Sequence, residues 1–123
     1  MAVPDHLPVH DRALTAYHDD IGTASSAFVY CPFNGRIVSI NYVEHGVVSG
    51  GDAAITTKIN GATIGATGSA TIAASGSGAG VRGTITPGIT AGIVTAGDTI
   101  ELASDGAPSS ISPVSWTVLV RAG

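Results

Sequence analysis

The stretch Val114-Ser115-Trp116-Thr117-Val118-Leu119-Val120-Arg121 decides the fold class of this 123-residue chain. Side chains two residues apart point to the same side of a β-strand, so its three valines and Trp116 would all face one core. No stretch of the chain keeps an apolar period of 3.6 residues between helix caps. The sequence therefore predicts an all-β protein.

A second long strand is predicted over residues 36–44, whose inner face would carry Val38, Ile40 and Tyr42. Asn60-Gly61 predicts a tight hairpin between residues 53–59 and 62–64, because both residues accept the positive φ of a type I′ turn. A further strand over residues 98–102 follows Ala96-Gly97. Weaker strand patterns cover residues 14–18, 27–31, 69–73 and 81–86. Short strands at this spacing predict a single antiparallel β-sandwich or jelly-roll-like domain.

The composition indicates a subunit of an assembly. Gly, Ala, Ser and Thr make up 60 of the 123 residues, and only 11% of the residues are charged. A free-standing soluble domain usually has about a quarter of its residues charged, so we expect other subunits to cover part of this surface. Nucleic-acid binding needs clustered Lys and Arg. The five cations of this chain are dispersed along the sequence, and we expect no nucleic-acid partner.

Residues 1–12 are predicted to form an extended N-terminal arm, and residues 13–123 the β-sandwich body. Pro4 and Pro8 each favour extended backbone at the preceding residue. The arm is either a frayed terminus or a tether that docks on a neighbour. Its candidate partner-contact residues are Val3, Pro4, Leu7, Pro8 and Val9.

Cofactor and metal motifs are weak. Gly78-Ala79-Gly80-Val81-Arg82-Gly83 matches a dinucleotide fingerprint, but a β-like run ending in Pro87 follows it where a helix is needed. Zinc requires ligands on ordered elements, and the candidate histidines lie largely on the arm: His6, His10 and His18. Asp52 and Asp105 lack the regular spacing of a calcium loop. We expect no cofactor and no metal.

Catalytic and targeting signals are equally thin. No Ser lies in a nucleophile elbow, and the lone Cys31 is expected to be a small buried hydrophobe. We therefore expect no enzyme. The N-terminus shows no signal-peptide pattern. Residues 59–81 are uncharged but too polar for a membrane span, so no membrane partner is expected either.

Two stretches resemble the small head-decoration proteins of tailed bacteriophages, also called cement or auxiliary capsid proteins. They are Phe28-Val29-Tyr30-Cys31-Pro32-Phe33-Asn34-Gly35-Arg36-Ile37-Val38-Ser39-Ile40 and Val94-Thr95-Ala96-Gly97-Asp98-Thr99-Ile100-Glu101-Leu102. The resemblance covers the layout of residues 25–123 and includes a final alternating strand that closes on Arg121.

The resemblance implies a structural virion protein on the outer capsid surface, synthesised in the host cytoplasm. It would bridge major capsid protein subunits and stabilise the shell, and its self-association as a homotrimer is favoured over a homodimer. Two alternatives remain. One is a carbohydrate-binding or receptor-binding sandwich that uses Tyr17, Tyr30 or Tyr42. The other is a different small virion or tail component.

Overall fold

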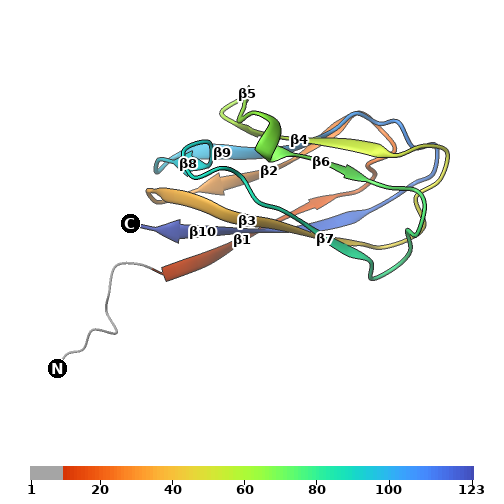
Figure 1. Cartoon of the computed structure of the whole chain (residues 1–123), viewed down its shortest axis with the longest axis horizontal. Helices are drawn as coiled ribbons and strands as arrows, with labels where there is room; N and C mark the ends of the chain where they lie inside the picture. The colour runs from red at the N-terminus through yellow and green to blue at the C-terminus, as the bar shows by residue number, and fades with distance from the viewer. Residues whose placement is uncertain (1–9) are drawn as a thin grey trace.

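The computed structural model describes residues 10–123 as two antiparallel five-stranded sheets packed face to face (Figure 1). In sheet A the order is β1-β10-β3-β7, and β8 also pairs with β3. Its strands are β1 (His10–His18), β3 (Gly35–Glu44), β7 (Arg82–Ile85), β8 (Ile93–Val94) and β10 (Val114–Ala122). This architecture confirms the predicted all-β, sandwich-like fold class.

Sheet B follows the order β2-β9-β4-β5, with β6 also pairing with β4. Its strands are β2 (Ser25–Cys31), β4 (Ala53–Ile59), β5 (Ala62–Thr63), β6 (Ser69–Ile72) and β9 (Asp98–Ser104). The 3₁₀ turn η2 (Ala66–Gly68) precedes β6. Within residues 10–123 there is no helix with the length and hydropathy needed to cross a bilayer.

The core lies between the sheets and is built from alternate residues of each strand. In β10 the predicted inner set is confirmed, since Val114, Trp116, Val118 and Val120 are all buried. The predicted hairpin is also confirmed: β4 pairs with β5 across Asn60 and Gly61, whose φ angles are 53° and 85°. Both angles lie in the region that a type I′ turn requires.

The expected inner face of β3 is wrong at Val38 and lacks Ile37. Leu119 of β10 pairs with Ser39, but the next residue, Val120, pairs with Ile37. Val38 is therefore left without a partner as the extra residue of a β-bulge, which re-aims the side chains on either side of it. As a result Ile37 joins Ile40 in the buried core, and Val38 is half-buried.

The boundary between arm and body also needs correction. Strand β1 begins at His10, so residues 10–12, which were assigned to the arm, pair with the end of β10. The remainder of the expected arm, residues 1–9, lies outside the described residues. The candidate contact residues fall there: Val3, Pro4, Leu7, Pro8 and Val9.

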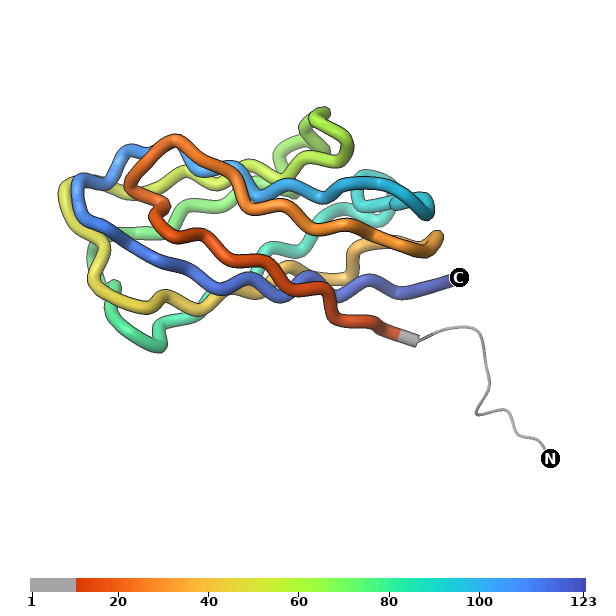
Figure 2. Tube along the Cα trace, turned by 180° about the vertical axis from the view of Figure 1, so that it is seen from behind, coloured from red at the N-terminus to blue at the C-terminus, as the bar shows by residue number. Residues whose placement is uncertain are grey.

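The sandwich has two distinct ends (Figures 1 and 2). The terminal end holds the start of β1, the end of β10, the β2–β3 turn and β8, because His10 pairs with Ala122 and Ala122 with Gly35. The loop end holds the β1–β2 turn and the connections over residues 45–52, 73–81 and 105–113.

Candidate contact surfaces

A row of small and polar side chains crosses the outer face of sheet A. It runs from Thr15 through Thr117 and Asn41 to Thr84. The Thr84 hydroxyl donates to Oδ1 of Asn41 at 2.8 Å, and Nδ2 of Asn41 donates to Oγ of Ser39 at 3.0 Å. Along this row the side chains are short, so another protein surface can approach the backbone closely.

Charge gathers where this face meets the terminal end. The register places Asp11, Arg121, Arg36 and Ile93 in one row across four strands. Nε of Arg121 donates to Oδ1 of Asp11 at 2.8 Å, and this ion pair holds the pKa of Asp11 below its usual range. A pocket of about 360 Å³ opens beside the row and is lined by Gly35, Arg36, Ile93, Arg121, Ala122 and Gly123.

Sheet B presents an exposed aromatic pair on its edge strand β2. Phe28 is 61% exposed and Tyr30 is 65% exposed, and both point away from the core. Their ladder partners on β9 are Glu101 and Thr99, and Glu101 in turn pairs with Lys58 of β4. The Ser26 hydroxyl donates to Oε2 of Glu101 at 2.5 Å. The result is an apolar stripe edged by hydrogen-bonding groups.

Sequence reasoning considered the tyrosines but missed Phe28. Of the three candidate tyrosines, Tyr30 lies on the stripe and Tyr17 is exposed on sheet A. Tyr42 packs on Trp116, with 5.4 Å between the ring centres. The missed signal is in the sequence of β2 itself. Its buried residues are small or aliphatic, while its outward residues, Phe28 and Tyr30, are aromatic where a solvated face would be polar.

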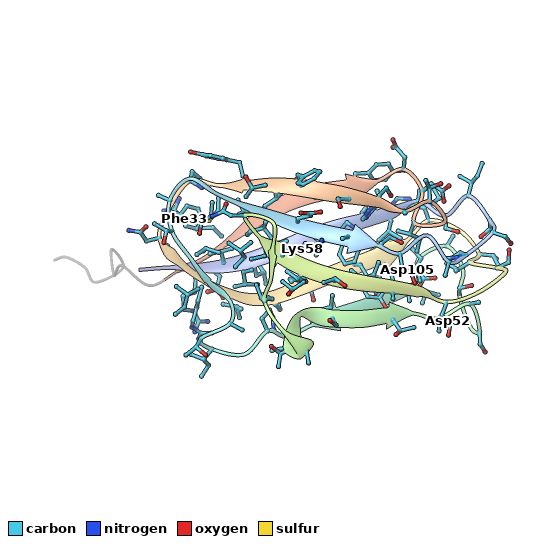
Figure 3. All side chains as sticks on the ribbon, turned by 90° about the horizontal axis from the view of Figure 1, so that it is seen from above. Phe33, Asp52, Lys58 and Asp105 are labelled. Atoms are coloured by element: carbon cyan, nitrogen blue, oxygen red, sulfur yellow. The ribbon has the colours of Figure 1, made fainter. Side chains whose placement is uncertain are left out.

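Two acidic side chains at the loop end stabilise turns by accepting hydrogen bonds from backbone N–H groups. Oδ1 of Asp52 accepts the backbone N–H of Ala74 at 2.9 Å, and Oδ1 of Asp105 accepts those of Ala54 and Ala107, each at 3.1 Å. Figure 3 shows Asp52 and Asp105 at the same end of the molecule, opposite Phe33. These bonds explain both residues as turn-forming groups.

Asp20 has the same role in the β1–β2 turn. Its Oδ1 accepts the backbone N–H groups of Gly22 at 2.8 Å and Ser112 at 2.9 Å, and its Oδ2 accepts the Thr23 hydroxyl. The bond from Ser112 lowers the pKa of Asp20. Asp20 also lines a pocket of about 300 Å³ with His18 and Asp19. The bonds that Asp20 accepts explain it as a residue that stabilises the β1–β2 turn and joins it to Ser112.

His18 belongs to the core. Nε1–H of Trp116 donates to Nδ1 of His18 at 2.9 Å, and Nε2 of His18 lies 3.2 Å from the carbonyl oxygen of Ser25. An indole nitrogen can only donate, so Nδ1 must be unprotonated and Nε2 carries the hydrogen. Burial lowers the pKa of His18, in agreement with this neutral form.

The other candidate histidines do not form a site with His18. His6 lies outside the described residues, and nothing is described of the His10 side chain. Among the described residues no three His, Cys, Asp or Glu side chains gather as a metal site would need. A separate pair, His45 Nε2 and the Ser115 hydroxyl, is 2.6 Å apart on the surface. Within residues 10–123 no carboxylate hydrogen-bonds the imidazole of His45.

Cys31 and the glycine motif at residues 78–83 both have structural roles. Cys31 is fully buried, as expected, and its thiol donates to the carbonyl of Phe33 at 3.3 Å. The glycine motif at Gly78–Gly83 is a loop that runs directly into strand β7, so the helix that a dinucleotide fingerprint needs is replaced by a strand. Neither feature carries a reactive site.

Comparison with known proteins adds a shared fold. No protein-family model and no curated protein matches the chain. Among solved structures, a chain of the "Cyanophage Pam1 capsid asymmetric unit" matches with a TM-score of 0.58 and 16% identity, over 100% of this chain and 93% of that one. The "Carbohydrate-Binding Module CBM36 in complex with calcium and xylotriose" gives a TM-score of 0.40 and 17% identity, over 80% and 75% of the two chains. The first likeness shows a common fold, and the second is too distant to support an argument.

Proposed function

We propose that this chain is a non-enzymatic structural virion protein that decorates the outer surface of a phage capsid and bridges major capsid protein subunits. The observation that carries the proposal is the full-length fold match to a chain of a cyanophage capsid structure, which covers 100% of this chain and 93% of the other. The resemblance of residues 28–40 and 94–102 to head-decoration proteins points the same way.

The surfaces suit a protein whose work is contact. The middle of the outer face of sheet A carries the uncharged row from Thr15 to Thr84, so it can approach a neighbouring surface with little desolvation of ions. The acidic side chains of the loop end are used in turns, and His18 in the core. A cementing subunit needs many such modest contacts, repeated by symmetry, and no reactive group.

The position of the chain in virus particles tests the proposal. Immunogold electron microscopy with an antibody against the body should label the head of the particle at many sites and leave the tail bare. Labelling confined to the tail would overturn the decoration function in favour of another small virion component. Particles without any label would overturn both the decoration function and the role as another virion component.

The aromatic stripe supports a second candidate, a carbohydrate-binding or receptor-binding sandwich. Exposed Phe28 and Tyr30 lie two residues apart beside the polar groups of Glu101 and Lys58. Aromatic faces edged by hydrogen-bonding groups suit amphipathic ligands. Glycan-array binding that is lost in Phe28→Ala but kept in Tyr17→Ala, an exposed aromatic on the other sheet, would favour this candidate. No glycan binding in the unaltered chain would remove it.

A further inference from the structure

The pocket at the terminal end combines apolar surface with the Arg36 guanidinium. Ile93, in its wall, is 57% exposed. Arg36 stands between Ile93 and Arg121 in the cross-strand row, and Arg121 forms the ion pair with Asp11. Asp11 is near enough to attract Arg36, but within residues 10–123 no carboxylate makes an ion-pair contact with the Arg36 guanidinium. An exposed isoleucine beside a guanidinium without such a contact suits an occupant that brings both apolar side chains and a carboxylate.

The chain itself contains such a segment, and it leaves the body at this place. Residues 1–9 hold Val3, Leu7 and Val9 together with Asp5. They precede His10, whose ladder partner Ala122 lines the pocket. Strand β10 ends at Ala122, the ladder partner of His10, and Pro8 has no N–H to donate to a sheet.

We propose that the pocket of one molecule binds residues 1–9 of a second copy of the chain. Within one molecule Arg36 and Ile93 lie beyond β10 from β1, and the strand of Arg36 is two strand spacings, about 10 Å, from β1, so the segment would have to reverse direction next to Pro8 to reach them. Pro4 and Pro8 instead favour extended backbone at the residues before them. Nine extended residues span about 30 Å, which is enough to reach a neighbouring molecule.

In this arrangement Leu7 packs against Ile93 and Asp5 lies near Arg36. Each copy gives a segment on one side and receives one on the other, so the contact is head-to-tail and generates a closed ring when the rotation allows it. A trimer is one such ring. Such a ring could form without a capsid.

Cysteine cross-linking between full-length chains tests the proposal. A chain carrying Leu7→Cys is mixed with a chain carrying Ile93→Cys under mild oxidation, and we expect a disulfide-linked dimer of the two, because the sulfurs would lie within bonding reach. The native Cys31 is fully buried and does not compete. The matched control is Leu7→Cys mixed with Ile111→Cys, at a residue that is 79% exposed at the loop end. This control should yield no comparable product.

Two results would overturn the proposal. One is equal cross-linking in the test and control mixtures. The other is a L7C/I93C double variant that closes its disulfide within a single chain at low concentration, which would show that the segment occupies its own pocket. Light scattering supplies a second measurement: Ile93→Asp should lower the mass to that of a monomer, while Ile111→Asp keeps the oligomer. Capsid binding that survives Ile93→Asp would leave the proposed function intact.

Discussion

At the scale of single residues, the His18 side chain of β1 lies between two hydrogen-bond partners. Its Nδ1 accepts the N–H of the buried Trp116 indole on β10, and its Nε2 faces the carbonyl oxygen of Ser25 on β2. Replacing His18 with leucine leaves the Trp116 N–H buried without an acceptor, a change that costs about 1–3 kcal/mol. We therefore expect His18→Leu to lower the free energy of unfolding by this amount in urea titrations. The control is His45→Leu at the surface, which should change stability by about 0.5 kcal/mol or less. Equal effects of the two changes would contradict the structural role of His18.

His18 also predicts a pH dependence of stability. Its pKa in the folded chain is lowered by burial, which outweighs the Ser25 carbonyl and the nearby carboxylates Asp19 and Asp20. In the unfolded chain it titrates near 6.5. As the pH falls through 6.5 the unfolded state binds more protons, so the free energy of unfolding decreases until the folded pKa is passed.

The measurement is the free energy of unfolding between pH 7.5 and 5, compared between the unaltered chain and His18→Leu. The unaltered chain should lose more stability over this range. Buried Glu44 has a raised pKa and acts in the opposite direction, but it is present in both proteins and cancels in the comparison. Parallel curves would show that His18 does not titrate differently in the folded and unfolded states.

At the scale of strands, Gly83 of β7 has no side chain, and the Tyr42 ring occupies the space beside it. The two residues are cross-strand partners, and a Cβ on Gly83 would collide with the Tyr42 ring and hydroxyl. That ring is held against Trp116, so it cannot move aside freely. We expect Gly83→Ala to destabilise the fold by about 1–3 kcal/mol in thermal or urea unfolding.

Gly78 supplies the matched control for this change. A Cβ there would meet nothing within 4 Å, and its φ is compatible with alanine. Gly78→Ala should leave stability unchanged or raise it slightly, by up to about 1 kcal/mol. If both alanine variants unfold alike, the space at Gly83 is not what positions Tyr42.

The strands also show what sequence patterns can and cannot predict. Alternation of apolar residues placed β10 correctly, and the positive φ that Asn60 and Gly61 accept placed the hairpin, because both features depend on local preferences. The bulge at Val38 is different: it arises from the pairing of β3 with β10, and no local pattern marks the residue that is skipped. The same holds for the start of β1, since residues 10–12 become a strand only through β10.

The candidate surfaces were harder to predict than the fold. Phe28 and Tyr30 could be read from β2 once its inner residues are known. The row from Asp11 to Ile93 joins residues from four strands that are far apart in the chain, so only the register brings them together. The sequence also does not show which backbone N–H groups donate to the acidic side chains of the loops.

At the scale of the whole molecule, residues 1–9 should serve assembly and not folding. Every buried hydrophobic residue described lies between Ile21 and Val120, so deleting residues 1–9 removes none of them. We expect the deletion to leave the thermal unfolding midpoint of the body within about 2–4 °C, a shift of less than about 1 kcal/mol. It should lower the occupancy of the chain on capsids, because fewer linked copies bind together.

The deletion must stop at residue 9. Removing residues 10–12 as well would take away part of the β1 ladder and the Asp11–Arg121 ion pair, and would mix a folding defect with an assembly defect. Unchanged occupancy after deletion of residues 1–9 would rule out an assembly role for this segment.

Cosedimentation with phage capsids that lack the chain tests whether it decorates the capsid. We expect saturable binding of the purified full-length chain, at a fixed ratio to major capsid protein, together with a higher temperature of capsid disruption. The matched comparison is the same chain mixed with dissociated capsid protein, which presents no assembled lattice to bridge. A chain that stays in the supernatant at every concentration, with capsid stability unchanged, would contradict a decoration role.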